Sequence, residues 1–384
     1  MARTIVIWGA GRIGRGFVAD IFNHEDWHTA FVDIDMNLVN MLNSEKAYPI
    51  YKATRDGVAK SVIQNGFSAF HTGDTASLRK LFEEENLLLD IAVHEPKLSE
   101  AADMLAPLIA HRAEAVPGRP MDVMMNVNMA APAERFISLM TGRLTGKALD
   151  YFSSSVGVTG IFAMCISPIA PGDILSKEPL ALWNNGFHEQ AIGKNLLKCP
   201  PPILPRLRLT DDVDKEEIRK LYTLNMAHAL SCYVGLKQNL KTAREAVMHP
   251  EIRAIISGAL EESCFGLIHE YGFSEEEMIA WRETIIALME NPYIEDQLQR
   301  LGADTRRKLG AYDRLTGPAR LSLAHGKTPV CLTKAIRAGF DYENDDDGTK
   351  AVRAFVKENG VEAAVRKFCD LSPDSPLMGL ILRP

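Results

Sequence analysis

The amino-acid sequence predicts an α/β fold in which a doubly wound parallel sheet is followed by a mainly α-helical domain. Two observations in the first half predict the sheet: short runs rich in Val, Ile, Leu and Met alternate with helical stretches, and a glycine-rich turn follows the first run. The third observation is a change of composition near residue 214, after which long helical patterns dominate.

The expected strands of the first half show little alternation of polar and apolar residues, which is typical of parallel strands covered on both faces. They are residues 4–8, 29–34, 89–93 and 123–128. Helices are expected directly after Gly14 and at residues 98–110. Segments 57–69 and 151–183 are interpreted as insertions that add strands to this domain.

The expected domain boundary lies in a proline-rich segment. Residues 199–205 read CPPPILP, and four prolines in seven residues cannot continue a helix or a central strand. We therefore expect a sheet domain at residues 1–198, a linker at 199–213 and a mainly helical domain at 214–384. The expected helices of the last domain are residues 215–234, 242–248, 251–271 and 274–290.

Composition excludes several classes of function. The 384 residues carry a formal net charge of −7, which argues against a nucleic-acid or membrane partner, although a local basic pocket could bind an anionic small molecule. The sequence contains neither a signal-peptide pattern nor a run of about 18 apolar residues, so a cytoplasmic protein is expected. Its six cysteines form no CxxC pair and HExxH does not occur, so we expect reduced thiols and chemistry without a metal.

A GxGxxG motif directly follows the first expected strand and predicts a dinucleotide site of Rossmann type. The three glycines permit a tight turn, close approach of a pyrophosphate, and close packing of helix on strand. The following helix points its first amide groups at the pyrophosphate. The expected cofactor-binding residues of the turn are Gly9, Ala10, Gly11, Arg12, Ile13 and Gly14. The alternative is a glycine-rich turn that binds no cofactor.

An acid at the end of the second strand predicts which dinucleotide binds. Asp33 lies 19 residues after Gly14, where a carboxylate can accept both ribose hydroxyls of NAD and repels the 2′-phosphate of NADP. Asp35 is the alternative for this role. Val93 and His94, at the end of the expected strand 89–93, are predicted to lie beside the cofactor, although such a histidine could also be an ordinary loop residue.

Lys220, Asn225 and His228 form the predicted reacting centre. A hydroxyl that loses its hydride to NAD must also lose a proton, so a base and hydrogen-bond donors are needed beside it. At about 100° per residue, Asn225 and His228 lie about 140° and 80° from Lys220 around a helix. Their neighbours are apolar, and burial lowers the pKa of a lysine because it disfavours the charged form. The alternative is a lysine that extends to solvent and two satisfied core polar groups.

Asn128 is a further candidate, since it ends the expected strand 123–128 at the cofactor side of the sheet and could donate to the reacting oxygen. Asn126 could do the same, but its place within that strand favours a structural role.

These residues are carried by stretches that resemble the polyol-specific long-chain dehydrogenases, also called the mannitol dehydrogenase family. The similar stretches are GAGRIGRGF, FVDID, KLYTLNMAH, IRAIISGALEES, ENPYIEDQLQRLG, RRKLGAYDRL and the pair Asn128-Met129. The Lys-x4-Asn-x2-His pattern is specific to that family, and a length near 380 suits its mannitol-phosphate branch. The resemblance implies a metal-independent oxidoreductase that uses NAD to interconvert a polyol, mannitol 1-phosphate as first choice, and its keto-sugar, fructose 6-phosphate.

The resemblance also implies roles for individual residues. Lys220 is the implied general acid/base, Asn128 and Asn225 polarise the reacting oxygen, and His228 orients it. Glu217 holds the place of an acid that gates proton release. Arg307 and Lys308 match basic positions near the substrate, where they could hold a phosphate or hydroxyls, although residues 306–308 could equally be a solvated basic cluster.

The chain departs from the family at three places. His94 stands where the family has glycine, Ala303 stands where the mannitol-phosphate enzymes carry arginine, and residues 156–168 lack the run Val-Asp-Arg-Ile-x-Pro. Substrate identity therefore stays open between a polyol phosphate, an unphosphorylated polyol and a hexuronate. A non-catalytic NAD-binding sensor is the alternative from another class of protein, and both a monomer and a dimer are compatible with the sequence.

Overall fold

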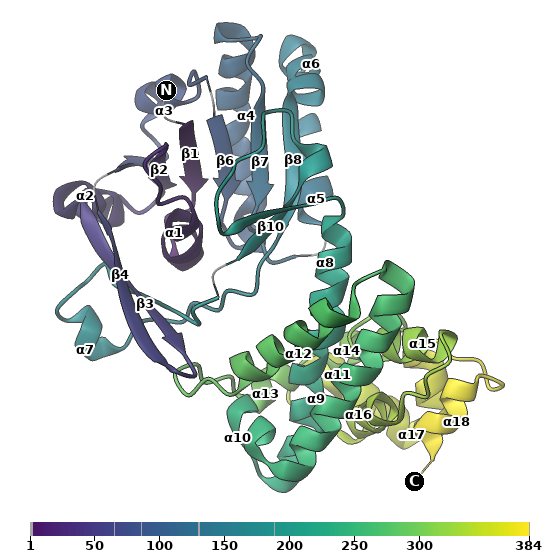
Figure 1. Ribbon diagram of the computed structural model, residues 1–384. Helices are drawn as coiled ribbons and strands as arrows, with labels where there is room; N and C mark the ends of the chain where they lie inside the picture. Colours follow the sequence, from purple (N-terminus) through teal and green to yellow (C-terminus); the bar gives the residue numbers. More distant parts are fainter. Residues whose placement is uncertain (1–2, 65, 86, 130, 188, 384) are drawn as a thin grey trace. The chain divides into compact units, whose positions relative to one another are not determined.

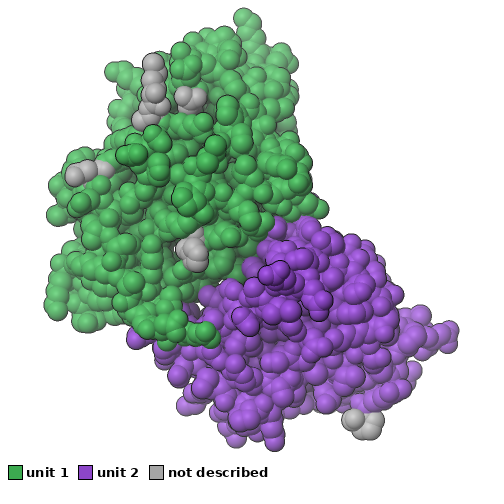
Figure 2. All heavy atoms as spheres, viewed as in Figure 1, with its two compact units in different colours: residues 1–213 green, residues 214–384 purple. Residues whose placement is uncertain are grey.

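The computed structural model describes residues 3–64, 66–85, 87–129, 131–187 and 189–383. Within it the chain forms two compact units, Met1–Val213 and Asp214–Pro384, which Figure 2 shows in green and purple. The first contains the sheets and the second is helical, so the predicted fold class is confirmed. In the described ranges, no helix is both long and apolar enough to cross a membrane.

The main sheet of the first unit has the strand order β11-β10-β8-β7-β6-β1-β2-β5 (Figure 1). From β5 to β8 all neighbours are parallel, and this is the order of the Rossmann fold, in which the strand order reverses between β1 and β6. The other two strands extend it, with β10 antiparallel to β8. The strands are β1 (Arg3–Trp8), β2 (Trp27–Asp33), β5 (Phe67–His71), β6 (Leu87–Ile91), β7 (Met121–Met125), β8 (Val156–Phe162), β10 (Gln190–Gly193) and β11 (Leu207–Thr210).

Helices cover one face of this sheet. They are α3 (Thr75–Leu81), α4 (Leu98–Ala115), which follows the short 3-10 turn η2 (Glu95–Lys97), α5 (Pro132–Thr141) and α6 (Gly146–Ser155). Their apolar side chains form one core cluster with alternate strand residues such as Val6 and Leu89, both fully buried. This face of the apolar strands is therefore covered, as the sequence predicts.

The other face is covered by the helix that follows the glycine turn, by α2 (Met36–Glu45) and by a second sheet. That sheet has the order β4-β3-β9, from β3 (Ala47–Thr54), β4 (Gly57–Gln64) and β9 (Leu182–Asn184). The glycine helix begins at Arg12, passes through the π-helical segment η1 (Gly14–Val18) and continues as α1 (Ala19–Ile21). The short elements α7 (Gly172–Leu175) and η3 (Lys194–Leu196) complete the unit.

Several predicted boundaries were wrong. The strands expected at 89–93 and 123–128 end at Ile91 and Met125, so His94, Asn126 and Asn128 all lie in loops beyond the strand ends. Segment 57–69 contributes β4 to the small sheet and β5 begins at Phe67, while β3 was not predicted. Within the expected linker 199–213, residues 207–210 form β11, because their backbone pairs with β10 at the sheet edge.

The second unit consists of helices (Figure 1). The helix predicted at 215–234 is composed of α8 (Val213–Lys220), the π-helical segment η4 (Leu221–Asn225) and α9 (Met226–Gly235), followed by η5 (Leu236–Gln238). The later helices are α10 (Ala243–Met248), α11 (Pro250–Tyr271), α12 (Glu275–Met289), α13 (Leu298–Gly302), α14 (Thr305–Lys308), α15 (Thr316–Ala324), α16 (Val330–Asp341), α17 (Asp347–Cys369) and α18 (Pro376–Leu382). Helix α17 is kinked at Gly360, whose φ is 80°.

Candidate functional site

The glycine turn joins β1 to the glycine helix, and its three glycines have different surroundings. Gly9 has φ 106°, and a Cβ on it would lie 2.5 Å from the Ala92 carbonyl oxygen. A Cβ on Gly14 would collide with the Gly9 carbonyl oxygen. A Cβ on Gly11 would meet no described atom within 4 Å, so the backbone there borders open space. This open cradle fits the pyrophosphate of a dinucleotide.

The π-helical segment η1 is held by one of its own side chains and by side chains from other elements. Arg15 Nε donates to the Ala10 carbonyl oxygen at 2.6 Å, and the Tyr48 hydroxyl of β3 donates to the Arg15 carbonyl at 3.1 Å. Asn184 Nδ2 of β9 donates to the Gly16 carbonyl at 2.8 Å. The small sheet thus fixes the helix that carries Arg12 and Ile13 at its start, and with it the glycine turn.

Asp33 and Asp35 have distinct positions. Asp33 ends β2, and its carboxylate accepts hydrogen bonds from the backbone N–H groups of Ala10, at 2.7 Å, and Asp35, at 2.9 Å. Asp35 caps the N-terminus of α2 by accepting from the N–H groups of Asn37 and Leu38. Asp33 therefore lies against the glycine turn and, as a half-exposed carboxylate, has further acceptor capacity for hydroxyl groups.

The ends of β6 and β7 carry the other candidates of the first unit. Val93 packs against Gly9, since its Cγ1 would lie 3.3 Å from a Cβ there. His94 is exposed at the start of η2. Asn128 is exposed in a tight turn, in which the Met129 N–H donates to the Val127 carbonyl at 2.9 Å.

Asn126 has a partner that the sequence reasoning missed. Its Nδ2 donates to Oδ2 of Asp90, which is fully buried on β6. Burial raises the pKa of Asp90 to about 8, and the bond from Asn126 lowers it by less. A signal existed, because Asp90 is the one charged residue in the apolar run LLLDI.

The second unit brings Lys220, Asn225 and His228 to one helix. All three are partly exposed, whereas Thr223, Leu224, Met226 and Ala227 between them are buried, so the exposure pattern puts the three on a common face. The segment between Lys220 and Asn225 is π-helical rather than α-helical, so the predicted angle of about 140° between them, drawn for a regular helix, does not apply.

Two hydroxyl groups satisfy backbone carbonyls at this π-helical segment. Thr223 Oγ1 donates to the Arg219 carbonyl, and Ser263 Oγ of α11 donates to the Tyr222 carbonyl, both at 2.6 Å. Trp281 Nε1 of α12 in turn donates to Thr223 Oγ1 at 2.9 Å. These bonds replace those that a regular helix would supply, so the irregular backbone is supported by its packing neighbours.

His228 is the best-defined ionisable group of this centre. Its Nε2 lies 4.0 Å from Asp296 Oδ2, and both side chains are almost buried. Burial lowers the pKa of His228 to about 4; Asp296 opposes this, while Arg300, Arg314 and Lys220 add to it. His228 is therefore a neutral imidazole near pH 7, able to donate one hydrogen bond and accept another. Asp296 and Arg314 belong to ENPYIEDQLQRLG and RRKLGAYDRL but were not singled out from the sequence.

The remaining candidates of the second unit differ in exposure. Glu217 is half-buried on α8, one turn before Lys220. Arg307 is exposed, and its Nε donates to Asp304 Oδ2 at 2.9 Å. Lys308 is buried; its Nζ donates to the Ala303 carbonyl, and burial, with the nearby charges of Arg314 and Arg307, lowers its pKa to about 8. Arg307 and Lys308 are thus not a uniformly solvated cluster.

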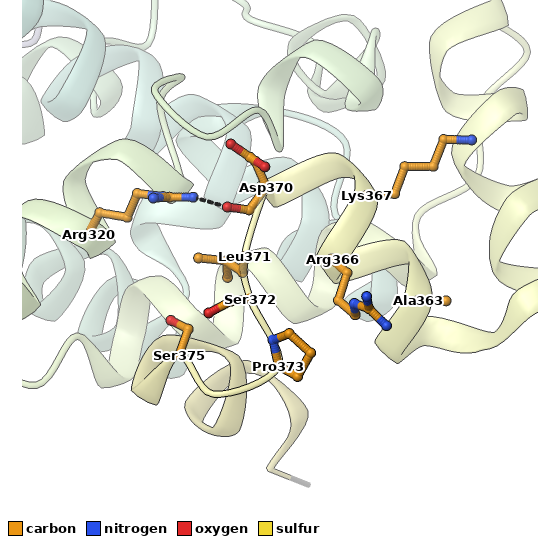
Figure 3. Close-up of a pocket in the computed structure, with 9 residues that line it drawn as sticks. All are labelled: Arg320, Ala363, Arg366, Lys367, Asp370, Leu371, Ser372, Pro373 and Ser375. Atoms are coloured by element: carbon orange, nitrogen blue, oxygen red, sulfur yellow. Dashed lines mark hydrogen bonds between the residues drawn. The ribbon is translucent and has the colours of Figure 1, made fainter.

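A hollow of about 780 Å³ lies elsewhere in this unit, between α15, α17 and the segment 370–375 that precedes α18 (Figure 3). Its lining includes Arg320 and Arg366, and Arg320 donates to the Asp370 carbonyl. None of the predicted site residues lines it.

The sequence matches two family models over nearly its whole length. Residues 3–203 match the mannitol dehydrogenase Rossmann domain, and residues 212–366 match the mannitol dehydrogenase C-terminal domain. Among curated relatives, mannitol-1-phosphate 5-dehydrogenase of Bacillus velezensis is 30% identical over 380 residues, 98% of each chain. The enzyme of the same name from Bacillus subtilis is 30% identical over 379 residues, again 98% of each chain.

Solved structures show the same fold at low sequence identity. A D-sorbitol dehydrogenase in substrate-free form is similar with a TM-score of 0.82 at 14% identity, covering 99% of this chain and 92% of that one. Mannitol 2-dehydrogenase of Pseudomonas fluorescens, in a ternary complex with NAD and D-mannitol, has a TM-score of 0.66 at 13% identity and covers 99% and 90%.

Proposed function

The chain belongs to the mannitol dehydrogenase family and is an NAD-dependent dehydrogenase acting on CH–OH groups, and we propose that it interconverts mannitol 1-phosphate and fructose 6-phosphate with Lys220 as general acid/base. The observation that carries this proposal is the common face of Lys220, Asn225 and His228 in a chain that also has a complete glycine turn. The six cysteines form no disulfide, which fits a reducing compartment, and we propose that the enzyme acts in the cytoplasm.

The first unit would hold NAD. The open space at Gly11 would receive the pyrophosphate, and the Asp33 carboxylate would accept hydrogen bonds from the ribose hydroxyls of the adenosine half. The same negative charge disfavours the 2′-phosphate of NADP. When bound, NAD accepts or supplies the hydride, so the chain itself needs to supply orientation and proton transfer.

Lys220 would remove the hydroxyl proton during oxidation and return it during reduction. The positive charge of its amine contributes to the lowered pKa of His228, which indicates that the two groups are near each other. The neutral His228 can donate a hydrogen bond to the substrate oxygen, and Asn225 and Asn128 would stabilise the charge that develops on that oxygen. Glu217, one turn before Lys220, is proposed to pass the proton on.

The phosphorylated substrate is supported by basic side chains near His228. Arg314 lies close enough to lower the pKa of both His228 and Lys308, and Arg307 also acts on Lys308. Such a concentration of positive charge, beside a lysine whose pKa is lowered by burial and further by these charges, would be stabilised by a phosphate dianion. We therefore propose that Arg307 and Lys308 contribute to phosphate binding.

The test of this function is NADH formation with a panel of substrates, measured with and without a chelator. Mannitol 1-phosphate is expected to give the highest kcat/KM, with turnover unchanged by the chelator because no step is assigned to a metal. Mannitol, glucitol 6-phosphate and a hexonate serve as comparison substrates. A preference for mannitol or a hexonate would contradict the phosphate assignment, and loss of turnover on chelation would contradict the lysine mechanism.

A further inference from the structure

Asp90 is a buried carboxyl group that the proposed chemistry does not use. It is fully buried on the central strand β6, where the residues in register with it are Ile7 of β1 and Met124 of β7. Asn126 donates to its Oδ2, and its Oδ1 has no hydrogen-bond partner among the described residues. An ionised carboxylate with one side-chain hydrogen bond in such an apolar setting is strongly disfavoured.

No donor among the described residues reaches Asp90 Oδ1. Gln190 of β10 is fully buried with its Nε2 4.0 Å from the Met124 sulfur, and its Oε1 also has no partner within the described part of the chain. This sheet face therefore has unpaired acceptors and a shortage of donors. Both conditions favour Asp90 as a neutral acid, and they explain why burial raises its pKa to about 8.

The position of Asp90 and Asn126 relates them to the cofactor site. Asp90 is the last residue but one of β6, and Asn126 directly follows β7, so the pair lies at the carboxyl edge of two adjacent parallel strands. Gly9 packs against Ala92, two residues after Asp90. In this fold the dinucleotide crosses the carboxyl edge where the strand order reverses, with its adenosine half at the β1–β2 side. Its nicotinamide half belongs on the β6–β7 side.

We propose that Asp90 is a positioning residue whose proton is linked to the oxidation state of the cofactor: the acid is neutral beside reduced nicotinamide and ionised beside the positively charged oxidised ring. Asn126 responds to this change, because its amide oxygen accepts from the neutral acid whereas its N–H donates to the carboxylate. The proton that Asp90 releases goes to solvent and returns when the ring is reduced, so the stoichiometry of the reaction is unchanged. This inference rests on the NAD site of the proposed function.

The charged and titratable groups around the pair are few. Neither of the two determinants of the Asp90 pKa is a charge, since they are burial and the Asn126 hydrogen bond. The groups on the neighbouring strands and the glycine helix, or directly beyond the strand ends, include Arg3, Asp122, Arg12, Arg15, Asp20, His94, Glu95 and Lys97. Lys220 of the second unit is proposed to act at the same nicotinamide ring, so its own titration must be removed from the experiment.

The experiment measures the dissociation constants of NAD⁺ and NADH separately from pH 6 to 9.5, without substrate, in the Lys220→Ala protein. We expect the Kd of NAD⁺ to fall roughly tenfold as the pH rises and Asp90 loses its proton. A unit negative charge close to a cation changes a binding constant by about this factor. The Kd of NADH should stay level, since the reduced ring is uncharged. Substitution of Lys220 leaves the glycine turn intact.

Three further variants assign the effect. In Asp90→Asn, which keeps the shape of the side chain, the pH dependence of the NAD⁺ affinity should disappear. In Asn126→Ala it should move to higher pH, because the bond that favours the ionised acid is lost. Asp122→Asn is the matched control, and the pH dependence should persist in it. Asp122 is also buried, but it lies two residues before Met124, the β7 residue in register with Asp90. Its carboxylate accepts from the N–H groups of Lys198 and Cys199.

The outcomes separate the two proposals. If the Lys220→Ala protein binds neither form of the cofactor, the NAD site itself is wrong. If it binds both with affinities that change equally with pH, or if Asp90→Asn retains the difference, the role of Asp90 is overturned while the proposed function stands. A merely structural Asp90 would alter stability without changing the ratio of the two affinities.

Discussion

Single residues of the glycine turn have separable contributions to folding and to cofactor binding. Gly14 is enclosed by the Gly9 carbonyl and the Ile7 side chain, whereas the described atoms leave the space beside Gly11 open. Gly14 is therefore required by the packing of helix on strand, and Gly11 by the ligand.

This difference leads to a prediction for two matched substitutions. Gly14→Ala should unfold the first unit or destabilise it by about 3 kcal/mol or more, because backbone atoms cannot move aside. Gly11→Ala should leave the melting temperature nearly unchanged but weaken NADH binding by about tenfold or more, since the new methyl group occupies the pyrophosphate cradle. Thermal unfolding and NADH titration of both variants check this; equal losses of stability would contradict it.

The buried acid Asp90 predicts how stability depends on pH. Its pKa is about 8 in the folded protein and about 4 in an unfolded chain, so the folded state binds the proton more tightly. The stabilisation is complete below pH 4 and is lost as the pH rises to about 8. Relative to Asp90→Asn, the wild-type protein should therefore lose on the order of several kcal/mol across this window, measured by urea unfolding at pH 5, 7 and 9. A constant difference between the two proteins would contradict this.

Individual site residues could be predicted from the sequence where neighbouring residues in the chain define their position. The position of Asp33 beside the glycine turn follows from the length of one strand-helix-strand unit. Asp35 has a different role, because its carboxylate caps α2. Asp90 and Asp296 were not singled out from the sequence, because the residues they contact, Asn126 and His228, are distant in sequence and a buried acid is recognised only by its surroundings.

Within the described ranges, two helices contain π-helical segments, and both belong to predicted functional elements. Segment η1 follows the glycine turn and η4 lies between Lys220 and Asn225. Each has backbone carbonyls that accept from side chains of other elements, Tyr48 and Asn184 for η1 and Ser263 for η4. Such segments are costly in isolation and frequent at functional sites, so these donors fix the backbone that presents the site.

Removal of one donor tests this account of η4. Ser263→Ala leaves the Tyr222 carbonyl without its hydroxyl donor in a buried setting, and the second unit should lose about 1–3 kcal/mol. Turnover should also fall while NADH affinity is unchanged, because the first unit is intact. Ser153→Ala is the control, since its hydroxyl makes a similar bond on an exposed surface. A stable Ser263→Ala protein with full turnover would contradict the account.

Neither π-helical segment could be predicted from the sequence. The stretches GRGFV and LYTLN contain no pattern that marks a π-helix, and the groups that stabilise the irregular backbone come from elements far along the chain. Strand β3 was missed although a local signal existed: it forms a hairpin with β4 across the turn Arg55-Asp56, which is followed by Gly57. Only its parallel pairing with β9 depends on residues far along the chain.

The whole molecule consists of two units with different parts of the proposed chemistry. The first carries the dinucleotide turn with Asp33, Asp90 and the asparagines after β7, and the second carries Lys220, Asn225 and His228. The overall architecture was predictable because apolar parallel strands, a glycine turn and long helices are strong local signals. The addition of β11 to the sheet was not, because its four residues follow a proline-rich segment.

The central claim is that Lys220 transfers the proton while the first unit supplies the cofactor. The most direct measurement is the single-turnover rate of NADH formation by Lys220→Ala, with and without added ethylamine, beside Lys215→Ala from the same helix as a control. We predict a rate lower by about 10²–10⁴-fold, unaltered NADH affinity, partial recovery with the amine, and a normal rate for Lys215→Ala. A Lys220→Ala protein that forms NADH at the wild-type rate would contradict the mechanism.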